Sequence, residues 1–318
     1  MVRRRSPDSL RKPRGVALIQ VLLVFALLMA ITTQIAFRQG VAIATASYTI
    51  EHAQGQAWVQ STEALAMADL AMDFSAPLAP DYWNEWSPEY PLDPELDIGT
   101  AQFRLVPLQG KFNLNWLHTE ANRPEAQEQL QRLLAAEGYE QAWAGRIADW
   151  FSADSGAEFE YRLVRPGYRP SFNPIADASE LRLMVPESGA LAPLELGEWG
   201  ALLPPWSRLD VTSAAESTIR ALHPDLGTEH WQALQTAIGN GLQSADDWLG
   251  MEVMEPFLGE LKSEWFTHEG EFYRMEARVR YQERLLYLTS WIHRGPDGIM
   301  TVYQRSRLPL NPEQEAAE

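Results

Sequence analysis

The most regular feature of the chain is an uninterrupted apolar run close to its N-terminus. Residues 16–37 read VALIQVLLVFALLMAITTQIAF, and Arg38 ends the run. A helix of this length spans roughly 30 Å, which matches the hydrocarbon layer of a membrane. Because the apolar core of a secretory signal is usually about 7–15 residues long, the run predicts a membrane-spanning helix.

Basic residues ahead of the apolar run predict its orientation. Residues 1–15 carry six Lys and Arg side chains and one Asp. By the positive-inside rule this leader stays in the cytoplasm, and the chain beyond Arg38 is exported. An ordinary signal anchor fits the same pattern, and the small residues Ala44-Thr45-Ala46 leave classical cleavage open as well.

Helical signals continue past the apolar run to about Phe74, without a proline to interrupt them. Small or apolar residues recur there every seven positions, at Ile50, Ala57, Ala64 and Ala71. Such a stripe allows a helix to approach a sheet or another helix closely. Residues 16–75 are therefore expected to form one transmembrane and amphipathic helix, roughly 90 Å long if continuous.

The remaining chain divides into three stretches. Residues 76–117 combine a proline-rich linker with a predicted hairpin, in which 101–106 would pair with 111–117 around the turn signal Gln109-Gly110. Residues 118–266 show helical periodicity, and residues 267–318 return to strand alternation. The expected fold class is α+β: a long N-terminal helix packed on an antiparallel sheet, with a large all-helical insertion.

Charge and composition exclude several kinds of function. The net charge of −17 opposes nucleic-acid binding, which needs a basic face for the phosphates. The chain has no cysteine, so disulfides, thiolate zinc sites and cysteine nucleophiles are excluded. The motifs H-E-x-x-H and G-x-S-x-G are absent and the six histidines are scattered, so no catalytic residues are expected.

Three segments stand out as motifs. Gly110-Lys111-Phe112-Asn113-Leu114-Asn115 reads as a strand whose asparagines bond nearby backbone. An acidic stretch from Asp149 to Tyr161 surrounds a glycine and leads to Asn173-Pro174 and Ser179-Glu180-Leu181. Leu209 to Ala215 precedes a helical signal, for which Thr212 or Ser213 is a suitable N-cap.

These segments, taken in this order behind the apolar helix, resemble the K-type minor pseudopilins of type II secretion. In that family a prepilin peptidase cleaves after a glycine that precedes the apolar helix, which implies cleavage after Gly15 and a methylated N-terminus at Val16. Pilins and most pseudopilins carry Glu at the fifth mature position, where this chain has Gln20. The K-type members typically lack that Glu too.

The resemblance also implies a metal ion. K-type pseudopilins bind calcium in their helical domain, and oxygen ligands are available here at Asp149, Asp154, Glu158 and Glu160. The spacing is not that of an EF-hand, and Ser152 and Phe159 stand where the family often has Asp. The alternative is a solvated acidic loop in which Asp149 pairs with Arg146.

The role implied by the resemblance is structural. The family member sits at the tip of the periplasmic pseudopilus with I-type and J-type minor pseudopilins, helps to initiate it and caps it. It is anchored in the inner membrane beside the secretion platform, with its body in the periplasm. The alternatives are a minor pilin of a type IV pilus and a membrane-tethered periplasmic enzyme.

Overall fold

The computed structural model describes residues 14–72, 85–184, 191 and 194–307. It divides into two units, residues 1–57 and residues 58–318, which are treated separately here. The leader of residues 1–13 lies outside the described part.

The first unit consists of most of helix α1 (Arg14–Met72). In this unit the large apolar side chains from Leu18 to Ile43 are exposed. The hydroxyls of Thr32 and Thr33 donate to the carbonyls of Leu28 and Met29, so neither polar group is left unbonded. Among the described residues, one helix is long and apolar enough to cross a membrane, and it is this helix near the N-terminus.

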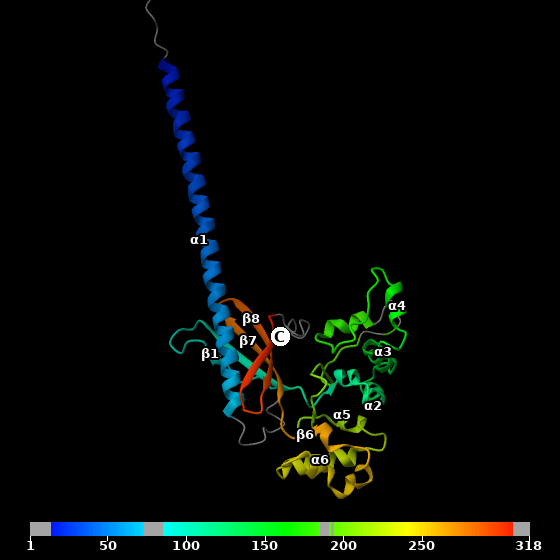
Figure 1. Ribbon diagram of the computed structural model, residues 1–318. Coiled ribbons are helices and arrows are strands. Elements are labelled where there is room, and N and C mark those ends of the chain that lie inside the picture. Colours follow the sequence, from blue (N-terminus) through cyan, green and yellow to red (C-terminus); the bar gives the residue numbers. More distant parts are fainter. Residues whose placement is uncertain (1–13, 73–84, 185–190, 192–193, 308–318) are drawn as a thin grey trace, which may run out of the picture. The chain divides into compact units, whose positions relative to one another are not determined.

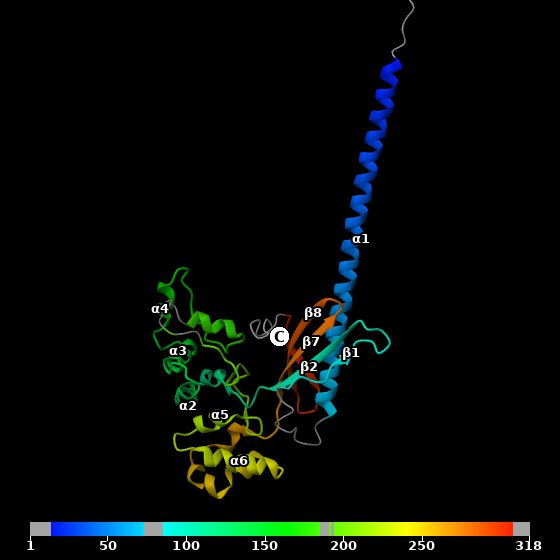
Figure 2. The same ribbon diagram turned by 180° about the vertical axis from the view of Figure 1, so that it is seen from behind.

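The second unit contains a five-stranded antiparallel sheet, ordered β1-β2-β7-β8-β9 (Figures 1 and 2). The strands are β1 (Tyr90–Pro91), β2 (Gly99–Pro107), β7 (Phe272–Tyr281), β8 (Arg284–Arg294) and β9 (Met300–Ser306). The central pair runs in register from Gly99 opposite Tyr281 to Pro107 opposite Tyr273. Strands from the two ends of the chain therefore form one sheet.

The end of α1 packs on this sheet. Val59, Ala66 and Leu70 are buried against Leu105, Met275, Val279 and Ile292. The alternation of β7 explains the fit, because its odd-numbered side chains from Tyr273 to Tyr281 are all buried on one face. The stripe of Ala57, Ala64 and Ala71 is exposed instead, so it is not the face that packs on this sheet.

Among the described residues, the helices after α1 all lie between β2 and β7 in the chain, as the predicted helical insertion requires. The insertion is not all-helical, because four short strands lie there too. The α-helices are α2 (Arg123–Ala136), α3 (Ala142–Phe151), α4 (Glu158–Leu163), α5 (Glu216–Ala221), α6 (Thr228–Gly239) and α7 (Ala245–Leu249). The 3₁₀ helices are η3 (Leu114–His118), η4 (Ala178–Met184), η5 (Glu252–Phe257) and η6 (Ser263–Trp265).

Two apolar cores hold the insertion. The first joins η3, α2, α3 and α4 around Leu130, Ile147 and Trp150. The second joins α5, α6, α7 and η5 around Ile219, Leu234 and Trp248. Two short parallel pairs complete the insertion, β3 (Phe112–Asn113) with β4 (Gly200–Ala201), and β5 (Leu209–Asp210) with β6 (Phe266–Thr267).

Two local predictions are wrong. The hairpin does not form, because β2 pairs with β7 from the far end of the chain and residues 114–118 become η3. Thr212 and Ser213 do not cap the next helix either. Both hydroxyls donate to the buried carboxylate of Asp210, and α5 begins only at Glu216, without a side-chain cap.

Candidate functional site

The predicted processing residues lie at the start of α1. Gly15 and Val16 are in its first turn, and Gln20 follows one turn later with an exposed side chain. An amide in this position can hydrogen-bond but carries no charge, unlike the Glu of most pseudopilins. Cleavage after Gly15 stays a prediction.

The predicted asparagine segment is a buried polar junction, which we define as residues Gln109–Asn115. Asn113 is fully buried and has four partners. Its Oδ1 accepts from the amides of Asn115 and Leu203, both at 3.0 Å, and its Nδ2 donates to the Pro204 carbonyl and the Ser207 hydroxyl, both at 3.0 Å.

Asn115 binds the same loops from the other side. Its Oδ1 accepts from the Ile175 amide at 2.7 Å, and its Nδ2 donates to the carbonyls of Ile175 at 3.0 Å and Leu203 at 2.9 Å. The asparagines were expected to bond the backbone of the adjacent turn, and this is wrong for most of their hydrogen bonds, which reach backbone 60 to 91 positions away. These hydrogen bonds to distant loops were missed because a short motif does not indicate which remote segments will lie beside it.

The remaining polar side chains of the junction are also satisfied. Gln109 accepts from the amides of Glu271 and Phe272 and donates to the Arg208 carbonyl at 3.1 Å. Lys111 donates to Glu198 at 2.8 Å, and burial lowers the pKa of its ammonium. Each of these buried polar side chains has partners within the fold, so the segment is suited to holding the insertion in place.

The four predicted calcium ligands do not converge. Glu160 accepts a hydrogen bond from Arg146 at 2.5 Å, whereas Glu158 contacts Arg162 at 2.6 Å and Arg169 at 2.9 Å. Asp154 is exposed. Within the described ranges no three His, Cys, Asp or Glu side chains are grouped so that they could hold a metal ion.

Asp149 is half-buried, and burial raises the pKa of its carboxyl while Arg146 opposes the shift. The alternative expected Arg146 to pair with Asp149, but its hydrogen bond goes to Glu160. A calcium ion takes six to eight oxygen ligands at about 2.3–2.6 Å. The residues as arranged do not fit such a site, and calcium binding itself stays untested. Arg162 and Arg169, which contact Glu158, were missed, although both follow the acidic residues closely.

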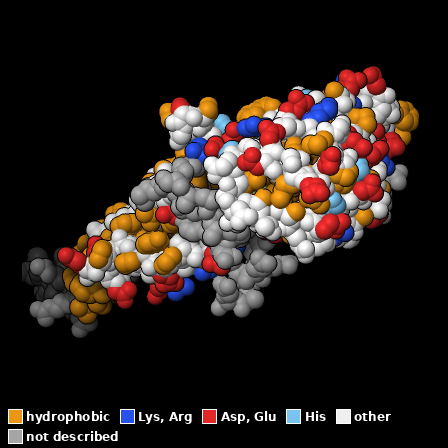
Figure 3. Space-filling model, turned by 90° about the horizontal axis from the view of Figure 1, so that it is seen from below, with side chains coloured by type: hydrophobic (Ala, Val, Ile, Leu, Met, Phe, Trp, Pro, Cys, Tyr) orange, Lys and Arg blue, Asp and Glu red, His pale blue; other side chains and the backbone are white. Residues whose placement is uncertain are grey.

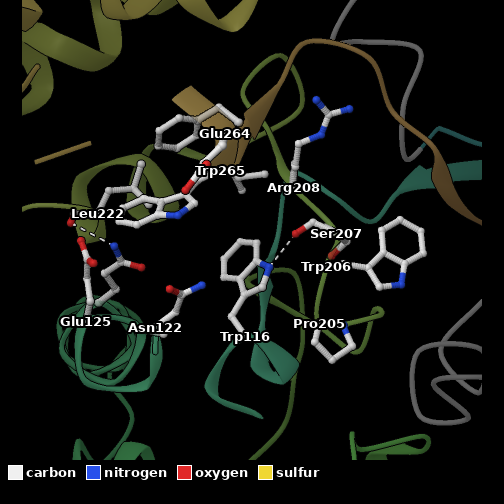
Figure 4. Close-up of a pocket in the computed structure, with 14 residues that line it drawn as sticks. Trp116, Asn122, Glu125, Pro205, Trp206, Ser207, Arg208, Leu222, Glu264 and Trp265 are labelled. Atoms are coloured by element: carbon white, nitrogen blue, oxygen red, sulfur yellow. Dashed lines mark hydrogen bonds between the residues drawn. The ribbon is translucent and has the colours of Figure 1, made fainter. Parts of the chain in front are cut away.

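A pocket of about 270 Å³ opens between the two cores of the insertion (Figure 4). Three indoles line it, those of Trp116, Trp206 and Trp265. Trp116 packs against both cores and donates to the Ser207 carbonyl at 2.7 Å, whereas Arg208 points away from the pocket and pairs with Glu271 at 3.6 Å.

Acidic side chains are spread over the face shown in Figure 3, and lysines and arginines are fewer there. This distribution agrees with the net charge of −17, and the face shown has no basic patch of the kind that a nucleic acid requires.

Comparison with known proteins shows which family the chain resembles. Residues 110–190, which include the junction and the acidic segment, match the family model "Type II secretion system (T2SS), protein K". The type II secretion system protein K of Pseudomonas aeruginosa is 28% identical over 317 residues, covering 93% of both chains. Over nearly its whole length the chain is similar to the type II secretion system protein K family. Its role is that of a minor pseudopilin, and these findings do not favour a minor pilin of a type IV pilus.

Two further proteins resemble the chain, one in sequence and one in fold. The protein K of Klebsiella pneumoniae is 26% identical, covering 86% of this chain and 92% of that one. The solved GspK-GspI-GspJ complex of the enterotoxigenic Escherichia coli type 2 secretion system contains a chain with the same fold. The TM-score is 0.63 at 18% identity, over 81% of this chain and 97% of that one.

Proposed function

We propose that this minor pseudopilin is the tip subunit of its pseudopilus, where it assembles with an I-type and a J-type minor pseudopilin. The observation that carries the proposal is the shared fold with a chain of the GspK-GspI-GspJ complex, across 97% of that chain. The relatives named protein K in two other bacteria support it.

The proposed mechanism is steric and involves no turnover. An insertion with two apolar cores between β2 and β7 is a large rigid addition to a pilin-like subunit. A subunit carrying it starts the assembly and leaves no room for another subunit above. The junction supports this role, because its buried hydrogen bonds tie the insertion to the chain where β2 ends.

The proposed anchoring follows from the apolar helix. Prepilin peptidase cleaves after Gly15, Val16 becomes the methylated N-terminus, and α1 spans the inner membrane beside the secretion platform. The body then lies in the periplasm. The single apolar helix near the N-terminus and the basic leader support this topology.

Co-expression tests the tip assignment. The tagged full chain is produced with the I-type and J-type pseudopilins of the same secretion system, extracted in detergent and purified by its tag. A stable complex of the three proteins is expected, and the major pseudopilin should not join it from above. Purification of the chain without either partner, under conditions in which all three are folded, would contradict the proposal.

Mass spectrometry of the mature protein tests the processing. Co-expression with the peptidase should give a methylated N-terminus at Val16, and Gly15→Ala should leave the leader attached. An intact Met1, or cleavage near Ala46, would support the plain signal anchor instead.

A further inference from the structure

Two carboxylates of the segment Asp149–Arg169, those of Glu158 and Glu160, contact arginines: Arg162 and Arg169 within the segment and Arg146 just before it. Its helices are α3, which ends at Phe151, and α4, which begins at Glu158. We propose that guanidinium groups close this acidic loop, in the place where the family resemblance implies a calcium ion.

The first contact joins the two helices. Arg146 Nη1 on α3 donates to Glu160 Oε2 on α4 at 2.5 Å, across 14 positions of the chain. Beneath it the ring of Trp150 packs edge-on against Tyr161, with 5.5 Å between centroids, and both are buried. The ion pair therefore lies over an apolar contact between the same helices, and the two together fix the angle at which the loop returns.

The second contact joins α4 to the chain that follows it. Glu158 Oε1 lies 2.6 Å from Arg162 Nη2 and 2.9 Å from Arg169 Nε, so one carboxylate oxygen is shared by two guanidinium groups. The backbone repeats this link, because the Tyr168 amide donates to the Tyr161 carbonyl at 3.1 Å. Arg169 thus ties the chain after α4 to that helix, as Arg146 ties α3 before it to the same helix.

The arginines and a calcium ion would compete for the same carboxylates, because both are positively charged. Glu158 and Glu160 are paired with Arg146, Arg162 and Arg169, and Asp154 is exposed. A calcium ion at these carboxylates would have to displace the guanidinium groups or lie beside them against like charge. Because arginine stays protonated at every relevant pH, its positive charge is permanent and belongs to the chain itself.

The consequence is a loop whose order is independent of the divalent cation concentration around the protein. Each exposed pair is weak by itself, but Arg162 and Arg169 share the carboxylate of Glu158, so less side-chain freedom is lost for each of these two pairs. The loop then needs no ion to hold α3 against α4.

The test uses the full chain in detergent, with hydrogen exchange of the peptides covering residues 149–169 as a local readout. Wild-type exchange and Tm are expected to be the same in calcium chloride and in EGTA, and isothermal titration with calcium should give no binding heat. The double variant Arg146→Gln/Arg169→Gln should exchange several-fold faster in this segment and respond to added calcium. Arg182→Gln, an exposed arginine on η4, is the matched control and should leave the segment unchanged.

Two results would overturn the proposal. One is calcium-dependent protection of the segment in the wild-type chain. The other is unchanged exchange in the double variant, which would show that the arginines do not hold the loop. The calcium titration of the wild type needs no substitution, so it decides the question even if the double variant does not fold.

Discussion

Glu63 on α1 accepts two hydrogen bonds from the guanidinium of Arg305 on β9, one to each carboxylate oxygen at 2.9 Å. Ser290 on β8 donates to the same carboxylate. The Glu63 side chain is only 6% exposed, whereas that of Arg305 is 54% exposed. A buried charge on the helix is therefore held by a cation at the rim of the sheet.

This asymmetry predicts that the two partners are unequal. Arg305→Gln leaves a buried carboxylate with Ser290 as its main partner, and should cost about 2 kcal/mol. Glu63→Gln removes the charge and should cost less. Thermal unfolding of the full chain in detergent, followed by near-UV circular dichroism, measures both, with Glu89→Gln as an exposed control. A larger loss for Glu63→Gln would contradict the assignment.

Asn113→Ala should be among the most damaging substitutions outside the apolar cores. It leaves the Leu203 amide and the Pro204 carbonyl without their partner in a fully buried place, at a cost of roughly 3 kcal/mol or more. The exposed Asn240→Ala is the control. Proteolysis of the insertion in the Asn113 variant, with the sheet intact, is the expected pattern. Equal resistance of both variants would mean that the junction does not hold the insertion.

Gly110 is fixed by space, because a Cβ there would lie 2.2 Å from the carbonyl oxygen of Ser213. Gly110→Ala must push these backbones apart and should cost roughly 2–3 kcal/mol. Gly239→Ala at the end of α6 meets nothing within 4 Å and should stabilise the chain by about 0.5–1 kcal/mol. Opposite shifts of Tm are therefore expected from the same chemical change, and a rise for Gly110→Ala would contradict the model of the junction.

Asp210 gives the chain a stability that depends on pH. Burial raises the pKa of this carboxyl, although Ser213 and Thr212 donate to it. Because the folded state binds the proton more tightly, the contribution of Asp210 to stability falls as pH rises from the ordinary Asp pKa to the raised one.

Asp210→Asn removes this dependence. The variant should be more stable than the wild type at neutral pH, and the difference should shrink as pH falls toward the ordinary Asp range. Tm measured for both proteins across the acid and neutral range checks the sign. A wild-type advantage that grows with pH would show that the ionised carboxylate stabilises the fold.

Local alternation predicted strands in residues 267–318, where β7, β8 and β9 lie, and helical periodicity predicted helices in residues 118–266, where α2 to α7 lie. The partner of β2 was not predictable, because the pairing joins Phe103 to Ala277 across the whole insertion. The sequence pattern also missed the helix face that meets the sheet. The stripe of alanines was chosen for its spacing, yet Val59, Ala66 and Leu70 are buried instead.

The surroundings of the candidate metal ligands were likewise not predictable from the local sequence. The sequence places Glu158 and Glu160 in one acidic segment, but whether they face a cation or a guanidinium depends on where Arg146 and Arg169 return. Asn113 and Asn115 were expected to bond the backbone near them, and most of their actual partners lie on loops 60 to 91 residues further along.

The insertion leaves the sheet and rejoins it at almost the same point. The Leu108 amide donates to the Phe272 carbonyl at 3.0 Å, and the Gln109 side chain bonds the amides of Glu271 and Phe272. Everything between these residues is one excursion whose two ends meet, so none of the strand pairings among β1, β2, β7, β8 and β9 depends on its length. A chain with this arrangement can gain, enlarge or lose its helical insertion during evolution while the strands of the sheet keep their register.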